Sequence, residues 1–253
     1  MPSRSLAFTT QPEPIWLFDL DNTLHNASAA IFAAIDSRMT ASIAELLQLD
    51  VPQADDLRQH YWRLYGATLI GLINQHQICP HDFLHRSHDF DVPPLIQSET
   101  YLVRYLQSLP GTKYIVTNAP ANYAQRVLRH LGLQSLFKRV FSIEDMFVQQ
   151  RCKPKPSAAF MRQLLVSLQA PAEQCIFIDD TLRNLKAAHR VGMRTVHFSH
   201  PATPFSSAYA GRSAYVDLRV RSIKELAQRG YELPVCRLPS NEKSALGRGT
   251  LKH

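Results

Sequence analysis

Two aspartates one residue apart, Asp19 and Asp21, follow a short apolar run in IWLFDLDNTLHN (residues 15–26). A second pair, Asp179 and Asp180, ends another apolar run, CIFIDD (residues 175–180). Two unit negative charges about 4 Å apart repel each other by about 4 kcal/mol at an effective dielectric constant of about 20. If both pairs share one cleft, they need positive charge. A hard divalent cation with oxygen ligands would supply it, and magnesium is the usual one where a phosphate completes the shell.

A third apolar run, YIVTN, ends in Thr117 and Asn118, and the turn RCKPKP contains Lys153. We predict that these three residues bind a phosphoryl group. Asp19 would then attack phosphorus in line. Asp21 would protonate the leaving oxygen and afterwards activate water.

The two carboxylates of the first pair can serve one ligand only if the chain bends. Alternate residues of a strand point to opposite faces of a sheet, so Asp19 and Asp21 would diverge in a straight strand. Asn22 and Thr23 are residues that favour a turn. We therefore predict a bend directly after the first strand.

The elements that carry these residues form an alternating pattern. Residues 15–20 read as a buried strand, and helical patterns follow over residues 27–49, 54–65, 68–76, 81–88 and 95–109. Strands are then expected at 113–118, 139–143, 174–180, 194–198 and 214–218, with helices at 121–133, 156–169, 182–192 and 222–230. Such alternation predicts an α/β fold with a Rossmann-like parallel sheet, whose ligands bind at the carboxyl ends of the strands.

The helical block after the first strand is read as an inserted cap. The predicted organisation is a disordered leader (1–14), a core (15–26 and 96–233), a helical-bundle cap (27–95) and a basic, disordered tail (234–253). No stretch approaches the ~18 apolar residues of a membrane span, and no signal-peptide pattern opens the chain. The four cysteines form no CxxC pair, so a cytoplasmic protein is expected.

The basic residues behind the net charge of +7 are dispersed along the chain, which disfavours a nucleic-acid partner. A small phosphorylated metabolite explains the charge equally well. Oligomeric state cannot be inferred from these features.

Four segments, FDLDNT, IVTN, CKP and FIDDTLRN, in this order, resemble the motifs of the haloacid dehalogenase-like hydrolase superfamily. The resemblance implies an aspartyl-phosphate mechanism with Asp19 as nucleophile and Asp21 as general acid and base. It also implies Thr117 and Lys153 as phosphate ligands. The implied metal ligands are Asp19, Asp21 through its carbonyl, and Asp180, with Asp179 assisting, and the implied cofactor is Mg²⁺. Many relatives have an acidic residue in place of Asn184.

Within the superfamily, YWRLYGATLIGL (residues 61–72), DFLHRSH (82–88) and CKPKPSAAF (152–160) are similar to the pyrimidine 5′-nucleotidase-like branch. This implies hydrolysis of nucleoside 5′-monophosphates, with the cap contacting base and sugar. Tyr65, Thr68 and His88 are the cap residues that we expect to set specificity.

Three alternative functions share parts of this pattern. A phosphatase or phosphomutase for another small metabolite, such as a sugar phosphate, would use the same core. A dehalogenase would not need Asp21 or Asp180. A regulatory or nucleic-acid-binding module on a retained fold would not need the complete set of chemical residues.

Overall fold

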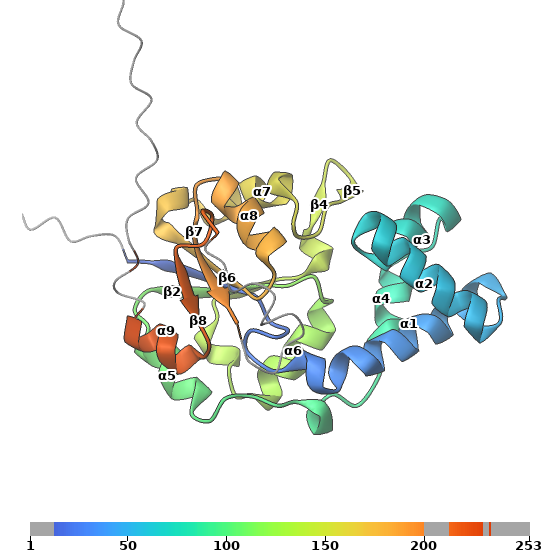
Figure 1. Ribbon diagram of the computed structural model, residues 1–253, viewed down its shortest axis with the longest axis horizontal. Coiled ribbons are helices and arrows are strands. Elements are labelled where there is room, and N and C mark those ends of the chain that lie inside the picture. The colour runs from blue at the N-terminus through green and yellow to red at the C-terminus, as the bar shows by residue number, and fades with distance from the viewer. Residues whose placement is uncertain (1–12, 200–212, 230–232, 234–253) are drawn as a thin grey trace, which may run out of the picture.

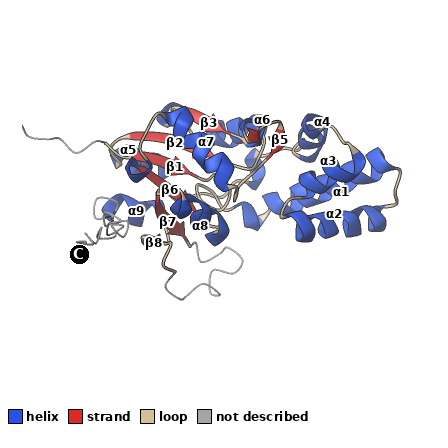
Figure 2. Ribbon diagram, turned by 90° about the horizontal axis from the view of Figure 1, so that it is seen from above, coloured by secondary structure: helices blue, strands red, loops and turns tan. Residues whose placement is uncertain are grey.

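A 6-stranded parallel sheet forms the centre of the protein, as the computed structural model shows for residues 13–199, 213–229 and 233 (Figures 1 and 2). The strand order is β3-β2-β1-β6-β7-β8, and every neighbouring pair is parallel. The strands are β1 (Ile15–Phe18), β2 (Thr112–Val116), β3 (Arg139–Phe141), β6 (Cys175–Asp179), β7 (Arg194–Phe198) and β8 (Leu218–Val220). The predicted α/β fold is confirmed. The predictions for residues 1–12 and for the tail 234–253 lie outside the described residues.

Helices cover both faces of the sheet, and the alternation of side chains along β1 explains why. Trp16 and Phe18 join one apolar cluster with α5 (Leu102–Ser108), α6 (Ala121–His130) and α9 (Ile223–Arg229). Leu17 joins the opposite cluster with α7 (Ala158–Leu168) and α8 (Leu182–Arg190). A strand buried on both faces needs the continuously apolar sequence that residues 15–18 have.

Four helices stand to one side of the sheet and are named the cap helices here (Figure 2). They are α1 (Ile31–Leu47), α2 (Val51–Tyr65), α3 (Thr68–His76) and α4 (Pro80–Ser87). Ile43, Tyr61, Leu72 and Phe83 form their own buried cluster. The first half of α1 packs instead with the core, through Ile31 and Ile35. The residue bounds of the cap stay a prediction.

Three elements differ from the sequence prediction. The last strand is Leu218–Val220 and not 214–218, so that prediction is wrong. The helix expected over 95–109 is confined to Leu102–Ser108. A two-stranded antiparallel hairpin, β4 (Phe147–Val148) with β5 (Arg151–Cys152), was not predicted. Its turn residues Gln149 and Gln150 have φ of 49° and 62°, values that a pattern of residue types does not reveal.

No helix within the described ranges has the length and apolar character to cross a membrane.

Candidate active site

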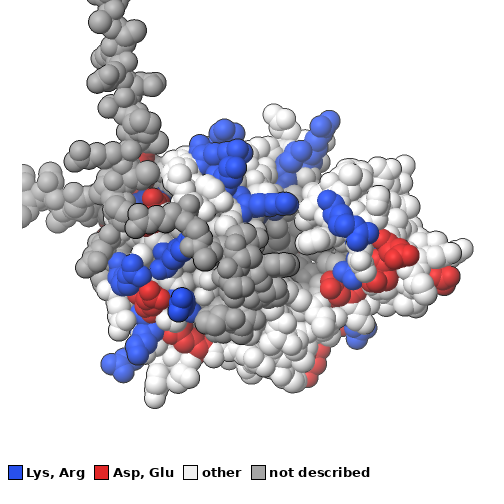
Figure 3. All heavy atoms as spheres, viewed as in Figure 1, with Lys and Arg blue, Asp and Glu red and all other residues white. Residues whose placement is uncertain are grey.

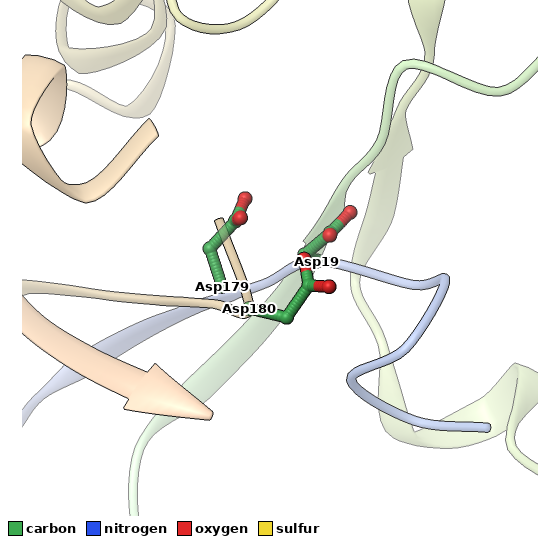
Figure 4. A group of neighbouring side chains, drawn as sticks. All are labelled: Asp19, Asp179 and Asp180. Carbon is green, nitrogen blue, oxygen red and sulfur yellow. The ribbon is translucent and has the colours of Figure 1, made fainter. Parts of the chain in front are cut away.

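The ends of β1 and β6 bring three carboxylates together. β1 and β6 are parallel neighbours, and Phe18 is paired with Ile178, so the next residue of each strand is an aspartate at the same edge. One carboxylate oxygen from each of Asp19, Asp179 and Asp180 lies within 4.8 Å of the others. Figure 4 shows these side chains gathered where the strands end. The predicted convergence of distant acidic strand ends is observed for these three residues.

The chain bends after β1 as the sequence predicts. The backbone of Asp19 still donates to the carbonyl of Ile178 at 2.8 Å, which continues the ladder by one residue. Asn22 has φ of 59°, in the left-handed region, where asparagine is tolerated better than most residues. The amide of Leu24 returns to the carbonyl of Leu20 at 2.9 Å. This turn keeps Leu20 buried while the two aspartates beside it face polar groups.

A buried lysine lies between two of the carboxylates. Lys155 Nζ donates to Asp19 Oδ1 at 2.7 Å and to Asp179 Oδ2 at 2.9 Å, with only 2% of its side chain exposed. Burial opposes the charge of Lys155, but Asp179 and Asp19 outweigh it and raise the pKa of the ammonium group.

The lysine that the structure places in the acidic cluster is not the predicted Lys153. Lys153 is exposed and makes no ion pair within the described part of the chain, whereas Lys155 is buried in the acidic cluster. The two lysines stand in one KPKP segment, and residue type alone does not distinguish them. The difference arises from the chain path, because Asn118 binds both backbone groups of Lys155, accepting from its amide at 2.9 Å and donating to its carbonyl at 3.0 Å.

The acidic cluster carries more negative charge than the lysine balances. Burial raises the pKa of Asp19 well above its ordinary value, and the charges of Asp179 and Asp180 add to this effect against the opposing Lys155. Burial and the neighbouring Asp179 raise the pKa of Asp180 to about 6. Three carboxylates against one ammonium group leave two uncompensated negative charges when all are ionised, which is the charge that a divalent cation balances.

Polar neighbours hold the second acidic pair in place. Asn184 donates to both carboxylate oxygens of Asp179, at 2.9 and 3.0 Å, and the amide of Thr181 donates to Oδ1 at 2.8 Å. Asp180 accepts from the Thr181 hydroxyl at 3.0 Å and from Asn22 at 3.3 Å. Asn184 therefore orients a carboxylate without adding charge to the cluster.

Thr117 and Asn118 follow β2 at the same edge of the sheet. Thr117 is buried, and its hydroxyl accepts from the amide of Ala119 at 3.0 Å. Asn118 holds the backbone of Lys155, as described above. Of the two residues predicted to bind phosphate here, Asn118 is thus occupied with positioning the lysine.

Asp21 lies apart from the three-carboxylate cluster and has its own partners. Tyr123, in α6, donates its hydroxyl to Asp21 Oδ1 at 2.7 Å, and His25 Nε2 lies 3.0 Å from the same oxygen. Burial alone would raise the pKa of Asp21, but His25 and Tyr123 outweigh it, and the pKa is lowered. Neither Tyr123 nor His25 is among the residues predicted from the sequence. Tyr123 stands five residues after Asn118, the last residue of IVTN, and near the start of a helix, which is a signal that could have suggested it.

The predicted cap residues lie in different surroundings. Thr68 is buried and donates to the carbonyl of Arg58 at 3.1 Å, inside the cap. His88 is 4% exposed, and its Nδ1 lies 3.1 Å from the carbonyl of Leu84. Tyr65 is half-buried and accepts a hydrogen bond from Gln75 at 2.9 Å. Thr68 and His88 are therefore enclosed by packing, whereas Tyr65 keeps some exposed surface.

Between the core and the cap helices the molecular surface is hollowed, as Figure 3 shows from one side. In that view Lys and Arg atoms stand beside the hollow on the core. Asp and Glu atoms gather on the cap. Cap carboxylates such as Asp36, Asp55 and Glu45 are paired with Arg58 and Arg86.

The chain is similar to proteins of known name, an enzyme among them. A phosphate metabolism protein 8 from Saccharomyces cerevisiae is 28% identical over 203 residues, a match that covers 72% of this chain and 61% of that protein. This chain thus spans less than two thirds of that relative. A 5′-nucleotidase from Pseudomonas aeruginosa is 25% identical over 194 residues, covering 72% of this chain and 81% of that protein.

Solved structures share the fold at lower identity. A HAD phosphatase from Thermococcus onnurineus superposes with a TM-score of 0.58 at 18% identity, covering 89% of this chain and 100% of that one. CbbY from Rhodobacter sphaeroides, solved in complex with phosphate, superposes with a TM-score of 0.56 at 16% identity, covering 85% of this chain and 96% of that one. The family described as haloacid dehalogenase-like hydrolase matches residues 16–198, a range that contains all the acidic residues discussed above. Together with the geometry of the strand ends, this match shows that the chain belongs to the haloacid dehalogenase-like hydrolases.

Proposed function

We propose that the protein is a magnesium-dependent phosphomonoesterase that works through an aspartyl-phosphate intermediate and hydrolyses nucleoside 5′-monophosphates, pyrimidine nucleotides among them. The observation that carries this proposal is the position of Asp19. Its carboxylate is at the end of β1, beside Asp179 and Asp180, and its Oδ1 accepts from Lys155. A carboxylate whose charge is balanced by an ammonium group and a bound cation stays ionised and can attack an electrophile.

The donor set fits a hard divalent cation. Asp19, Asp179 and Asp180 offer carboxylate oxygens, which Mg²⁺ prefers, and burial together with repulsion between the carboxylates raises the pKa of Asp19 and of Asp180. We propose that Asp19 and Asp180 hold the ion, with the carbonyl of Asp21, and that Asp179 assists. When bound, the ion neutralises the charge of the phosphate oxygens.

The side chains then divide the chemistry between two steps. In the first, an oxygen of Asp19 forms a bond to phosphorus while the bond from phosphorus to the leaving oxygen breaks, and that oxygen takes a proton from Asp21. In the second, Asp21 takes a proton from water as the water oxygen bonds to phosphorus and the bond to Asp19 breaks. The products are the free alcohol and inorganic phosphate, and both aspartates return to their starting state.

The pKa of Asp21 is consistent with both steps. In the free site His25 and Tyr123 keep this pKa low despite burial, so Asp21 is ionised, as a base must be. A phosphate dianion beside the carboxylate disfavours a second negative charge and raises the pKa. The acid form needed in the first step would therefore arise when substrate is bound.

Lys155, and not Lys153, is the lysine of the proposed phosphate site. Its ammonium group is already at the nucleophile, whereas Lys153 is exposed. Thr117 stays a proposed phosphate ligand, since it directly follows β2, the strand next to β1.

The proposed preference for nucleotides is supported by a similar protein and by a residue of the cap. A 5′-nucleotidase is among the similar proteins. Tyr65 is the cap residue that we propose for contact with the base, because an aromatic ring with exposed surface can stack on it. We propose a cytoplasmic location, as expected from the scattered cysteines of the sequence.

A panel of phosphorylated metabolites tests the function. Phosphate release is measured with Mg²⁺, with chelator, and with the Asp19→Asn variant as control for a contaminating phosphatase. We expect nucleoside monophosphates to give the highest kcat/KM, and chelator or the variant to abolish release. No release from any substrate by folded wild-type protein would refute the proposal.

A second candidate substrate class is a small phosphorylated acid or sugar. A phosphoglycolate phosphatase from Pectobacterium atrosepticum is 23% identical over 198 residues, covering 72% of this chain and 79% of that protein. The same panel separates the two, because sugar phosphates or phosphoglycolate would then rank far above the nucleotides.

A further inference from the structure

The carboxylate of Asp21 is anchored through only one of its two oxygens. Oδ1 accepts from the Tyr123 hydroxyl at 2.7 Å and lies 3.0 Å from His25 Nε2. Within the part of the chain that the structure describes, Oδ2 has no hydrogen-bond partner. A carboxylate fixed in this way cannot rotate freely, yet keeps one oxygen available to carry a proton.

The tyrosine that makes this contact is itself fixed. Tyr123 is fully buried, and its ring packs against the His88 ring in a T-shaped arrangement at a centroid distance of 5.3 Å. The ring of Phe90 lies 6.4 Å away. One helical turn further along α6, Arg126 donates to the carbonyl of Phe90 at 2.7 Å and also to that of His88. The phenol is therefore held between α6 and the segment that leads from the cap back to the core.

The hydroxyl of Tyr123 stays protonated in this environment. The ordinary pKa of a tyrosine hydroxyl, about 10, lies well above neutral pH. The group is thus a permanent donor to Asp21 and does not exchange protons with it near neutral pH.

We propose that Tyr123 is a positioning residue that holds Oδ1 of Asp21 so that Oδ2 exchanges the proton with the leaving oxygen and then with water. This inference rests on the proposed phosphomonoesterase function. The proton moves from Oδ2 to the leaving oxygen as the bond from phosphorus to that oxygen breaks, and a proton from water returns to Oδ2 in the second step. Tyr123 keeps its own proton throughout.

The test uses substrates that differ in their need for an acid. A 4-nitrophenolate ion leaves readily without a proton, whereas a benzyl alkoxide does not. For each phosphate ester, kcat/KM reports only the steps up to release of the alcohol. We expect Tyr123→Phe to lower kcat/KM for benzyl phosphate about tenfold more than for 4-nitrophenyl phosphate, since a positioned acid contributes about 10²-fold or more. Phenyl phosphate should fall between them.

The ratio of the two kcat/KM values does not depend on how much of the variant is folded, so partial misfolding does not obscure the result. Tyr114→Phe is the matched control, because Tyr114 is also a buried tyrosine but is near the middle of β2, away from Asp21. It should leave the ratio unchanged. Equal losses for both substrates in Tyr123→Phe would overturn the inference. A wild-type protein that hydrolyses none of the esters would instead refute the proposed function.

Discussion

Replacing Lys155 by methionine is the perturbation whose outcome the structure defines most sharply. Methionine has a similar length but no charge, so the substitution removes the ammonium group that lies 2.7 Å from Asp19 and 2.9 Å from Asp179. Lys153→Met is the matched control two residues away, on an exposed side chain.

The magnitude follows from burial. Removing one partner of a buried ion pair costs about 3–5 kcal/mol, because the remaining charge is left uncompensated. Lys155 has 2% of its side chain exposed and Asp179 has 0%. We therefore expect the free energy of unfolding of metal-free Lys155→Met to fall by about 3 kcal/mol at pH 7. An exposed substitution such as Lys153→Met should change it by less than about 0.5 kcal/mol.

Both quantities are measurable with one protein preparation. Urea unfolding followed by fluorescence gives the free energy of unfolding, and phosphate release with Mg²⁺ gives activity. Lys155→Met should lose at least about 100-fold in kcat/KM, because an electrostatic contact with the transferred phosphoryl group contributes about that much. Lys153→Met should retain activity close to that of the wild type.

Two results would contradict the reasoning. If Lys153→Met lost activity while Lys155→Met kept it, the lysine at the phosphate would be Lys153, as predicted from the sequence. If both variants unfolded at the wild-type urea concentration, the ion pairs of Lys155 would not stabilise the fold.

Three further predictions concern the same region. Without metal, the carboxyl of Asp180 has a pKa of about 6, so it contributes stability that is present below the unfolded pKa of about 4 and is lost as pH rises through about 6. Between pH 7 and pH 5 the melting temperature should therefore rise more in the wild type than in Asp180→Asn. Mg²⁺ should also stabilise the wild type less at pH 5 than at pH 7. Burial lowers the pKa of His88 to about 4, so its contribution to stability is present above a pH of about 6.5 and is lost as pH falls toward 4. In thermal unfolding with chelator, His88→Gln should therefore lose less stability on acidification than the wild type. Asn184→Ala should weaken Mg²⁺ binding by calorimetry about tenfold, since Asp179 loses two hydrogen bonds that orient it.

The features that the sequence predicts well are those set by local patterns. Continuous apolar runs predict strands buried on both faces, and parallel pairing then fixes where Asp19 and Asp179 meet. The bend after β1 is predicted from Asn22, whose side chain tolerates positive φ. These predictions need only the period of the pattern and the chemistry of single residues.

The features that it misses depend on the chain path between elements. Lys153 and Lys155 have the same side chain, and the contacts of Asn118 with the backbone of Lys155 decide which lysine is buried. The strand predicted at 214–218 begins instead at Leu218, and the carboxylate of Asp217 accepts from the amide and hydroxyl of Thr195 in the neighbouring strand. Such tertiary contacts have no signature in a single sequence.

The measurement that tests the central claim most directly is identification of the residue that carries phosphate during turnover. Wild-type protein is mixed with substrate and Mg²⁺, quenched in acid within the first turnover, digested and analysed by mass spectrometry. The account predicts a phosphorylated peptide with the modification on Asp19, absent from Asp19→Asn. Phosphate on any other residue, or substrate turnover by Asp19→Asn at the wild-type rate, would contradict it.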